Sequence, residues 1–285
     1  MPEFADAYGV AIVYDVYEPE GTPRGVVQVL HGVGEHAGRY AALADELAAA
    51  GWVVYADDHR GHGRTGMRQH GTAEKLGRLG VGGHRAAVAA VRQLSEHIRA
   101  ERPGLPLVLL GHSWGSFLAQ ILFDRHPGAY DAVVLVGSSL RWPGSLNAGD
   151  LNARWKTPEA NGVEWLSTDE AVQRAFLADP LTVDVPLAKL FGVADTLRLV
   201  GRPRRGLRRE AGADVPVLLL VGRDDSVGGP RSVHRLADAY RRRAGLSDVT
   251  VHVYDGRHEI LNEPVQGEVR SDIVAWLDAR FPAAV

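Results

Sequence analysis

The stretch Gly111-His112-Ser113-Trp114-Gly115 decides how this chain folds, and it follows directly on the apolar run 107–110. The run has the length and composition of a buried strand, and a helical segment begins at about residue 116. The motif therefore predicts a sharp turn from strand to helix. Its two glycines lack the Cβ atoms that would collide there, and the serine takes strained backbone geometry. Such a turn raises the serine hydroxyl above the sheet and directs the first N–H groups of the helix toward whatever bonds to it.

Composition limits the kinds of protein that this chain can be. With 285 residues it is long for one domain and short for two, so we expect one α/β domain with an inserted subdomain. The net charge of −3 offers no attraction to nucleic acid, and we expect no nucleic-acid partner. Cysteine is absent, which excludes disulfides and thiolate metal sites. The acidic N-terminal residues do not resemble a secretory signal, and no run reaches the roughly 18–20 apolar residues of a membrane span. We therefore expect a cytoplasmic protein without a transmembrane segment.

Strands alternate with helices along most of the chain, which favours a mostly parallel sheet with helices on both faces. The predicted strands are 10–17 (an edge strand), 26–30, 52–57, 107–110, 132–137, 215–221 and 249–254. The segment 141–213 breaks this rhythm, because it has no β-branched run and holds three of the six tryptophans. A structureless loop of this length is implausible in a compact domain. We therefore predict a core of residues 1–140 and 214–285 with a helical cap at 141–213.

A serine needs a base to remove its proton, and the base needs a third group to hold it. After Ser113, the loop that follows strand 215–221 supplies Asp224 and Asp225, and the loop that follows strand 249–254 supplies His258. In an open parallel sheet the carboxyl ends of the strands form the edge where sites assemble. The order serine, acid, histidine therefore predicts that these side chains meet at one edge.

The chain has twelve histidines, and position along the chain separates them. Only His258 has the late position after a strand that the order demands. We expect His112, inside the turn, to be structural, and His84, near a helix end, to be exposed to solvent. The glycine-rich loop 31–36 could also suggest a phosphate-binding loop, but it lacks the Gly-Lys-Ser/Thr ending that such loops need.

Five segments in the same order along nearly the whole chain resemble the monoacylglycerol lipase and lysophospholipase branch of the α/β-hydrolase superfamily, often grouped with the serine aminopeptidases. These segments are His31-Gly32-Val33-Gly34-Glu35-His36-Ala37-Gly38-Arg39-Tyr40, Asp58-His59-Arg60-Gly61-His62-Gly63-Arg64-Thr65, Gly111-His112-Ser113-Trp114-Gly115, Gly222-Arg223-Asp224-Asp225 and His258-Glu259-Ile260-Leu261-Asn262-Glu263. The first and last are more specific to this branch than the serine turn, the nucleophile elbow. The resemblance implies an α/β-hydrolase fold with a lid-like cap.

By this resemblance Ser113 is the nucleophile, His258 the base, and Val33 and Trp114 supply the N–H groups of an oxyanion hole. The usual spacing of three residues after the glycine selects Asp225 as the acid. Asp224 remains the alternative, or else a loop carboxylate that caps the turn or the next helix. The chain departs from the family at Trp114, where methionine or a small residue is usual, and at Ser116, where a glycine is usual.

The implied activity is hydrolysis of single-chain carboxylic esters such as monoacylglycerols, without a metal or organic cofactor. The partner would be a small ester with an apolar acyl chain, and the cap could also touch a membrane transiently. Candidate residues for the acyl chain are Trp142, Leu146, Trp165 and Phe176, although such residues also make up the small core of a cap. A lysophospholipase, lactonase or peptidase on the same scaffold remains an alternative, as does a non-catalytic binding protein.

Overall fold

The computed structural model describes residues 1–147 and 149–282; residues 148 and 283–285, which belong to the predicted cap and core ranges, lie outside the described part. Its centre is an eight-stranded sheet with the strand order β1-β2-β4-β3-β5-β6-β7-β8. The strands are β1 (Glu3–Ala5), β2 (Ala11–Tyr17), β3 (Gly25–Leu30), β4 (Trp52–Asp57), β5 (Leu107–His112), β6 (Ala132–Val136), β7 (Val217–Gly222) and β8 (Val249–Tyr254). The six strands from β3 to β8 are parallel to their neighbours among themselves, which confirms the predicted mostly parallel sheet.

The strand order changes direction at β3: β4 pairs on one side of it and β5 on the other. Leu30 at the end of β3 is the register partner of Gly111 in β5. The loops that leave β3 and β5 therefore start side by side at the carboxyl edge of the sheet. Crevices at such a switch point are where open α/β sheets bind their ligands.

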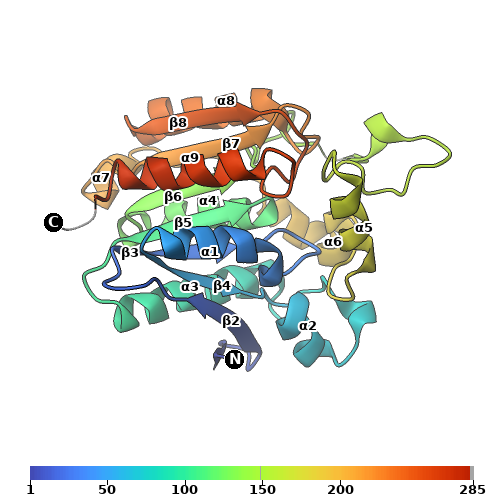
Figure 1. Ribbon diagram of the computed structural model, residues 1–285, viewed down its shortest axis with the longest axis horizontal. Helices are drawn as coiled ribbons and strands as arrows, with labels where there is room; N and C mark the ends of the chain where they lie inside the picture. Colours follow the sequence, from blue (N-terminus) through green and yellow to red (C-terminus); the bar gives the residue numbers. More distant parts are fainter. Residues whose placement is uncertain (148, 283–285) are drawn as a thin grey trace.

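Helices cover both faces of the sheet (Figure 1). Two of them, α1 (Ala41–Ala49) and α9 (Gln266–Asp278), bury their apolar sides against one face. The opposite face is packed by α3 (Gly83–Glu101), α4 (Trp114–Arg125) and α8 (Gly229–Ala239). Both faces of the central strands are dry, which explains their continuous apolar sequences. Each fully buried aliphatic side chain stabilises the fold by about 1.5–3 kcal/mol.

The predicted edge strand is not at the edge. Strand β1 pairs antiparallel with β2 and takes the edge position, so the assignment of residues 10–17 was wrong in this respect. The Asp6 carboxylate accepts the backbone N–H groups of Tyr8 and Val10 and so closes the turn that folds β1 back. A strand of three residues is too short to leave a periodic signal in the sequence.

Helix α2 (Gly63–His70) lies in a glycine-rich stretch for which the sequence predicts no helix. Tertiary contacts hold it in place. The Thr65 hydroxyl accepts the Val13 N–H at 2.9 Å in a buried position, and the Arg64 guanidinium binds the Asp15 carboxylate with both of its terminal nitrogens. Long-range contacts here override weak helix propensity.

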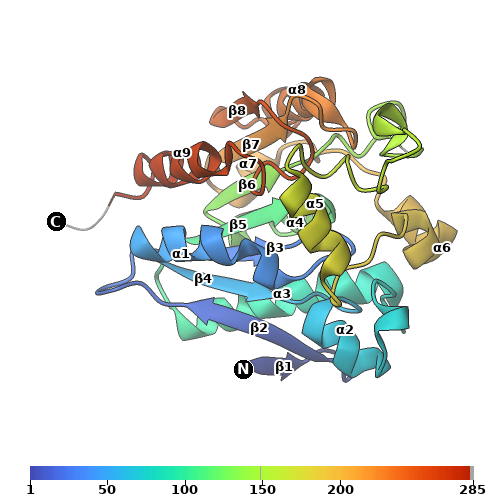
Figure 2. The same cartoon turned by 45° about the vertical axis from the view of Figure 1, so that its right-hand side comes forward.

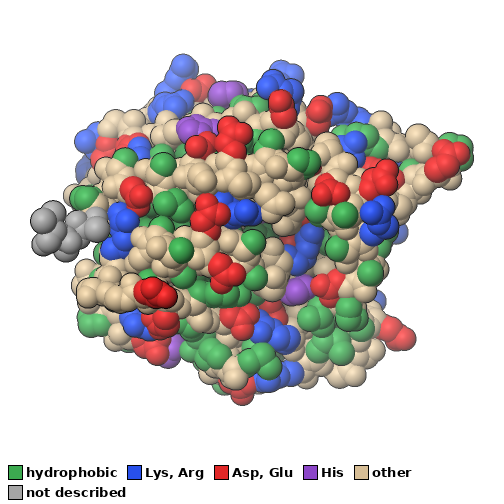
Figure 3. Space-filling model, viewed as in Figure 1, with side chains coloured by type: hydrophobic (Ala, Val, Ile, Leu, Met, Phe, Trp, Pro, Cys, Tyr) green, Lys and Arg blue, Asp and Glu red, His purple; other side chains and the backbone are tan. Residues whose placement is uncertain are grey.

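Between β6 and β7 the chain forms helices α5 (Glu170–Ala178), α6 (Leu187–Arg198) and α7 (Leu207–Ala211) in place of strands. Helices α5 and α6 lie near the same end of the sheet but apart from each other (Figure 2). Acidic and basic side chains are interspersed over the face shown in Figure 3. Within the described ranges, no helix combines the length and the apolar character that crossing a bilayer requires.

Two histidines at helix starts are buried, His62 directly before α2 and His84 in the first turn of α3. His84 is only 3% exposed, which overturns its expected contact with solvent, because Phe191 and Asp195 of α6 cover the start of α3. Burial lowers the pKa of His84 to about 4 and the pKa of His62 to about 4. Both rings are therefore neutral at physiological pH.

These histidines predict that acid destabilises the fold. Between pH 6.5, where an ordinary histidine titrates, and pH 4, the unfolded chain binds protons that the folded chain excludes. Their contribution to the free energy of unfolding is complete above pH 6.5. It is lost as the pH falls toward 4, by up to roughly 3 kcal/mol per ring. Urea unfolding at a series of pH values measures this loss. The slope of the unfolding free energy against pH should decrease in His84→Gln. It should stay unchanged in His234→Gln, a control variant at an exposed histidine. An equal slope in all three proteins would contradict this origin of the acid sensitivity.

Candidate active site

The turn between β5 and α4 holds Ser113 in unusual backbone geometry. Its φ of 51° and ψ of −121° make it the only non-glycine residue with positive φ in the described part of the chain. A Cβ on Gly115 would lie 2.1 Å from the Leu30 carbonyl oxygen, and one on Gly111 would lie 2.4 Å from the Gly115 carbonyl oxygen. The glycines therefore allow three backbone segments to meet. Strain of this kind costs about 1–3 kcal/mol and is maintained where the surroundings enforce it.

The loops after β7 and β8 bring Asp225 and His258 together. His258 Nδ1 donates to Asp225 Oδ2 at 3.0 Å, and both side chains are buried. The second carboxylate oxygen of Asp225 accepts the Val227 N–H at 2.7 Å, which fixes the plane of the carboxylate. His258 Nε2 is buried and has no hydrogen-bond partner among the described residues. An imidazole that donates through Nδ1 to a carboxylate presents an acceptor lone pair at Nε2.

Asp224 lies in different surroundings from its neighbour. Its side chain is half-exposed, and its carboxylate pairs with the Arg154 guanidinium at 2.8 Å. Arg154 belongs to the segment between β6 and β7. The alternative interpretation, in which the Asp224 carboxylate caps the turn or the next helix, is therefore wrong. The two adjacent carboxylates point to different partners, and only that of Asp225 bonds to His258.

The imidazole of His258 lies against the elbow. Its ring centroid is 4.9 Å from that of His112, the residue that precedes Ser113. On another side the ring centroid of Trp165 lies 5.0 Å away, and the Trp165 carbonyl accepts the His258 N–H. The loop after β8 therefore contacts both the elbow and the segment between β6 and β7.

The loop after β3 approaches the serine from the opposite side. A Cβ on Gly32 would lie 3.1 Å from Ser113 Cβ. Val33 follows directly in this loop, and Trp114 begins α4. The two residues predicted to donate to an oxyanion therefore belong to the two segments that flank Ser113.

A buried carboxylate, Glu35, organises this loop. Glu35 Oε1 accepts the Gly32 N–H at 2.6 Å and the Tyr40 hydroxyl at 2.7 Å, and lies 3.1 Å from His112 Nδ1. Burial would raise the pKa of Glu35, but the His112 hydrogen bond and the Arg39 charge outweigh burial and hold it well below its usual range. Burial likewise lowers the pKa of His112, and the hydrogen bond and charge of Glu35 reverse the effect and raise it.

Arg39 extends this network to the loop after β8. It donates to Glu35 Oε2 at 2.8 Å and to both carboxylate oxygens of Glu259 at 2.6 and 2.7 Å. Glu259 directly follows His258, so the ion pair ties the loop after β3 to the loop after β8. No role for Glu35, Arg39 or Glu259 follows from the sequence alone. Their signal was present, because charged side chains in loops after strands flank the predicted site, but a sequence does not show which charges pair.

The four residues predicted to bind an acyl chain lie in different surroundings. Trp165 is next to His258, as described above. Phe176 is buried in a small cluster with Val163 and Leu166. Leu146 packs, half-buried, on the main core, and Trp142 is 40% exposed with the Arg202 guanidinium over its ring.

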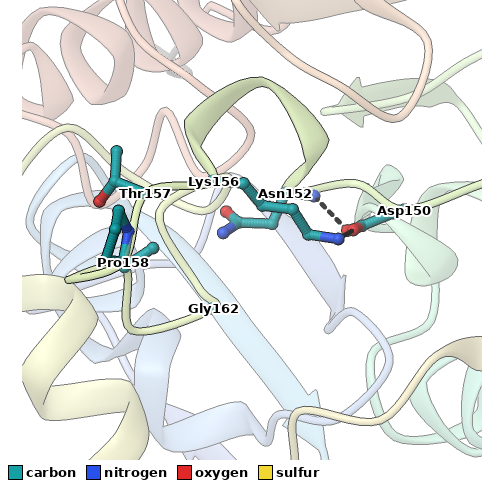
Figure 4. A pocket seen from close by; sticks show the side chains of 7 residues that line it. Asp150, Asn152, Lys156, Thr157, Pro158 and Gly162 are labelled. Carbon is teal, nitrogen blue, oxygen red and sulfur yellow. Dashed lines mark hydrogen bonds and ion pairs between the residues drawn. The ribbon is translucent and has the colours of Figure 1, made fainter.

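The segment between β6 and β7 also carries an open hollow of about 530 Å³ (Figure 4). It is lined by Asp150, Asn152, Lys156, Thr157, Pro158, Ala160 and Gly162. The Lys156 ammonium and the Asn152 N–H both bind the Asp150 carboxylate. None of the four predicted acyl-binding residues lines this hollow.

Comparison with known proteins places the chain in a family. The pattern of the family described as serine aminopeptidase, S33 matches residues 21–265. The chain is 34% identical to the monoacylglycerol lipase of Mycolicibacterium smegmatis, over 96% of this chain and 95% of that protein. It is 29% identical to human monoglyceride lipase, over 100% of this chain and 92% of the relative.

Solved structures agree with this result. A thermostable carboxyl esterase from Bacillus coagulans, solved with glycerol, superposes with a TM-score of 0.83 at 25% identity, covering 98% of this chain and 97% of the esterase. A monoglyceride lipase variant from Saccharomyces cerevisiae shares the fold with a TM-score of 0.74 at 20% identity, covering 96% and 94% of the two chains. The predicted α/β-hydrolase fold and resemblance are confirmed, and the chain belongs to the serine aminopeptidase S33 family of α/β-hydrolases, in its monoacylglycerol lipase branch, and is a serine hydrolase.

Proposed function

We propose that the chain hydrolyses single-chain carboxylic esters, of which monoacylglycerols are the model, through Ser113, His258 and Asp225. The observation that carries the proposal is the buried Asp225–His258 hydrogen bond of 3.0 Å, which leaves His258 Nε2 without a partner beside the strained elbow. The relatives named monoacylglycerol lipase and carboxyl esterase support an ester as the substrate.

The reaction would proceed in two halves. His258 Nε2 takes the Ser113 hydroxyl proton while the serine oxygen attacks the ester carbonyl carbon. The backbone N–H groups of Val33 and Trp114 stabilise the negative charge on the carbonyl oxygen. The tetrahedral intermediate expels the alcohol, which receives the proton from His258, and leaves an acyl-serine. Water then attacks the acyl-serine while His258 takes its proton. His258 returns this proton to the Ser113 oxygen as the acid leaves.

The remaining parts of the proposal concern the segment 141–213, which would act as a cap over the site. Its Trp165 is already in contact with His258, which supports a role next to the reacting ester. Apolar side chains of this segment would hold the acyl chain, with Trp142, Leu146 and Phe176 as further candidates. Exposed apolar residues of the cap, such as Val193 and Val200, would allow it to touch a membrane transiently.

Replacing the nucleophile tests the mechanism. Ser113→Ala should lower turnover of a p-nitrophenyl ester by roughly 10⁶-fold, because no other group forms the acyl-enzyme. A fluorophosphonate label should react with the wild type and not with the variant. The melting temperature should not fall, because alanine fits the same turn and keeps the backbone contacts. Turnover above about 1% of wild type in the purified variant would exclude Ser113 as the nucleophile.

The adjacent aspartates provide a matched pair for the acid. Asp225→Asn should lower turnover by about 10⁴-fold, since the amide no longer holds His258 in the tautomer that accepts at Nε2. Asp224→Asn removes only an exposed contact with Arg154 and should change turnover by less than about twofold. Steady-state kinetics of both variants measure the ranking. The reverse ranking would show that the acid had been assigned to the wrong neighbour.

A further inference from the structure

The residue that follows the nucleophile carries an unusually large side chain. Trp114 begins α4 and is fully buried, at 0% exposure. Its indole Nε1–H is also buried and finds no hydrogen-bond partner among the described residues. Buried indoles usually satisfy this group, and leaving it unpaired is unfavourable. What the side chain supplies here is therefore volume next to Ser113, and not a hydrogen bond that fixes the fold.

Four rings from three segments of the chain enclose the indole. The His62 ring stacks on it with 5.2 Å between ring centroids, and the His59 ring meets it edge-on at 5.5 Å. The His84 ring lies 6.3 Å away and the Phe191 ring 4.9 Å away. Because burial keeps the His62 and His84 rings neutral at physiological pH, this enclosure does not present their positive charge to a ligand.

Phe191 reaches the indole from α6, in the segment between β6 and β7. Gly192 breaks the helix directly after it, with φ 75° and ψ 171°, a conformation that favours glycine. The following residues turn outward, and Val193 is 77% exposed. Beyond the break, the Asp195 carboxylate accepts the His84 N–H at 2.9 Å, at the start of α3. Helix α6 is thus anchored on the core with Phe191 pressed on Trp114.

A second hollow lies on the other side of Phe191. It measures about 250 Å³ and is lined by Arg78, Leu79, Gly80, Gly83, Lys189, Leu190, Phe191 and Asp195. Phe191 contributes to this lining and also packs on Trp114. One ring therefore belongs both to the wall of this hollow and to the packing around the residue that follows Ser113.

We infer that Trp114 and Phe191 form a two-ring plug that limits the length of the acyl group beside Ser113, so that the enzyme prefers esters of short acids. The inference rests on the proposed function and specifies its substrate class. Within an open apolar channel, each added methylene would raise kcat/KM by about three- to fourfold. With the plug in place this gain should stop after a few carbons, and longer chains should be penalised.

The test varies only the acid, with p-nitrophenol as the constant leaving group, from about two to about sixteen carbons. The measured quantity is the ratio of kcat/KM for a twelve-carbon ester to that for a four-carbon ester, roughly spanning the expected stop. Trp114→Met keeps the backbone N–H and should raise this ratio by at least about tenfold, the gain from two to three accepted methylenes. Phe191→Ala opens the same passage from the side of α6 and should raise it too.

Two matched variants control for general effects. Leu197→Ala lies on the same helix beyond the break and is 64% exposed in the wild type, and Trp155→Met removes a tryptophan outside this cluster. Neither should change the ratio. Thermal unfolding of every variant shows whether it is folded, and Phe191→Ala carries the test alone if Trp114→Met does not fold.

The outcomes separate the two proposals. A wild type that hydrolyses short esters through Ser113 but shows an equal or rising kcat/KM up to long chains would overturn the plug and leave the proposed function intact. An unchanged ratio in folded Phe191→Ala and Trp114→Met would overturn it as well. Absence of hydrolysis with every ester would contradict the proposed function, and the plug with it.

Discussion

The site depends on the close approach of three backbone segments at the elbow. Ser113 can hold its positive φ only because β3, β5 and the first turn of α4 pack at distances that exclude a Cβ at Gly111 and Gly115. The strain is local, whereas the contacts that enforce it extend through the centre of the sheet. A well-packed parallel sheet is therefore a requirement of the site itself, and reactivity is placed where the fold is most rigid.

Buried charges then fix the loops that the sheet leaves free. Glu35 holds the loop after β3, and Arg39 joins it to Glu259 and hence to the loop that carries His258. Each of Glu35, Arg39 and Glu259 has a counter-charge in this network, so short, charge-assisted hydrogen bonds offset the cost of removing these charges from water. Removing one partner would leave an uncompensated buried charge near the elbow, which is more costly than losing one contact.

The sequence predicted the parts of this protein that follow from local patterns. Apolar runs predicted the parallel strands, and the chain order of Ser113, Asp225 and His258 predicted which loops converge. It failed where distant contacts decide the outcome. The edge strand β1 is too short for periodicity, α2 forms against its own propensity, and the burial of His84 depends on α6, more than a hundred residues away. The pairing of Arg39 with Glu259 also has no counterpart in local sequence.

Glu263 sets where the segment above the site can bend. This carboxylate is fully buried and accepts the Thr168 N–H and the Ser167 hydroxyl, and also the N–H of Arg257, the residue before His258. Lifting residues 167–168 would strip donors from a buried negative charge. Residues 167–168 are therefore held firmly against the loop after β8, which carries His258. A movement of residues 167–168 would be transmitted directly to the loop that carries His258, because one buried carboxylate binds both.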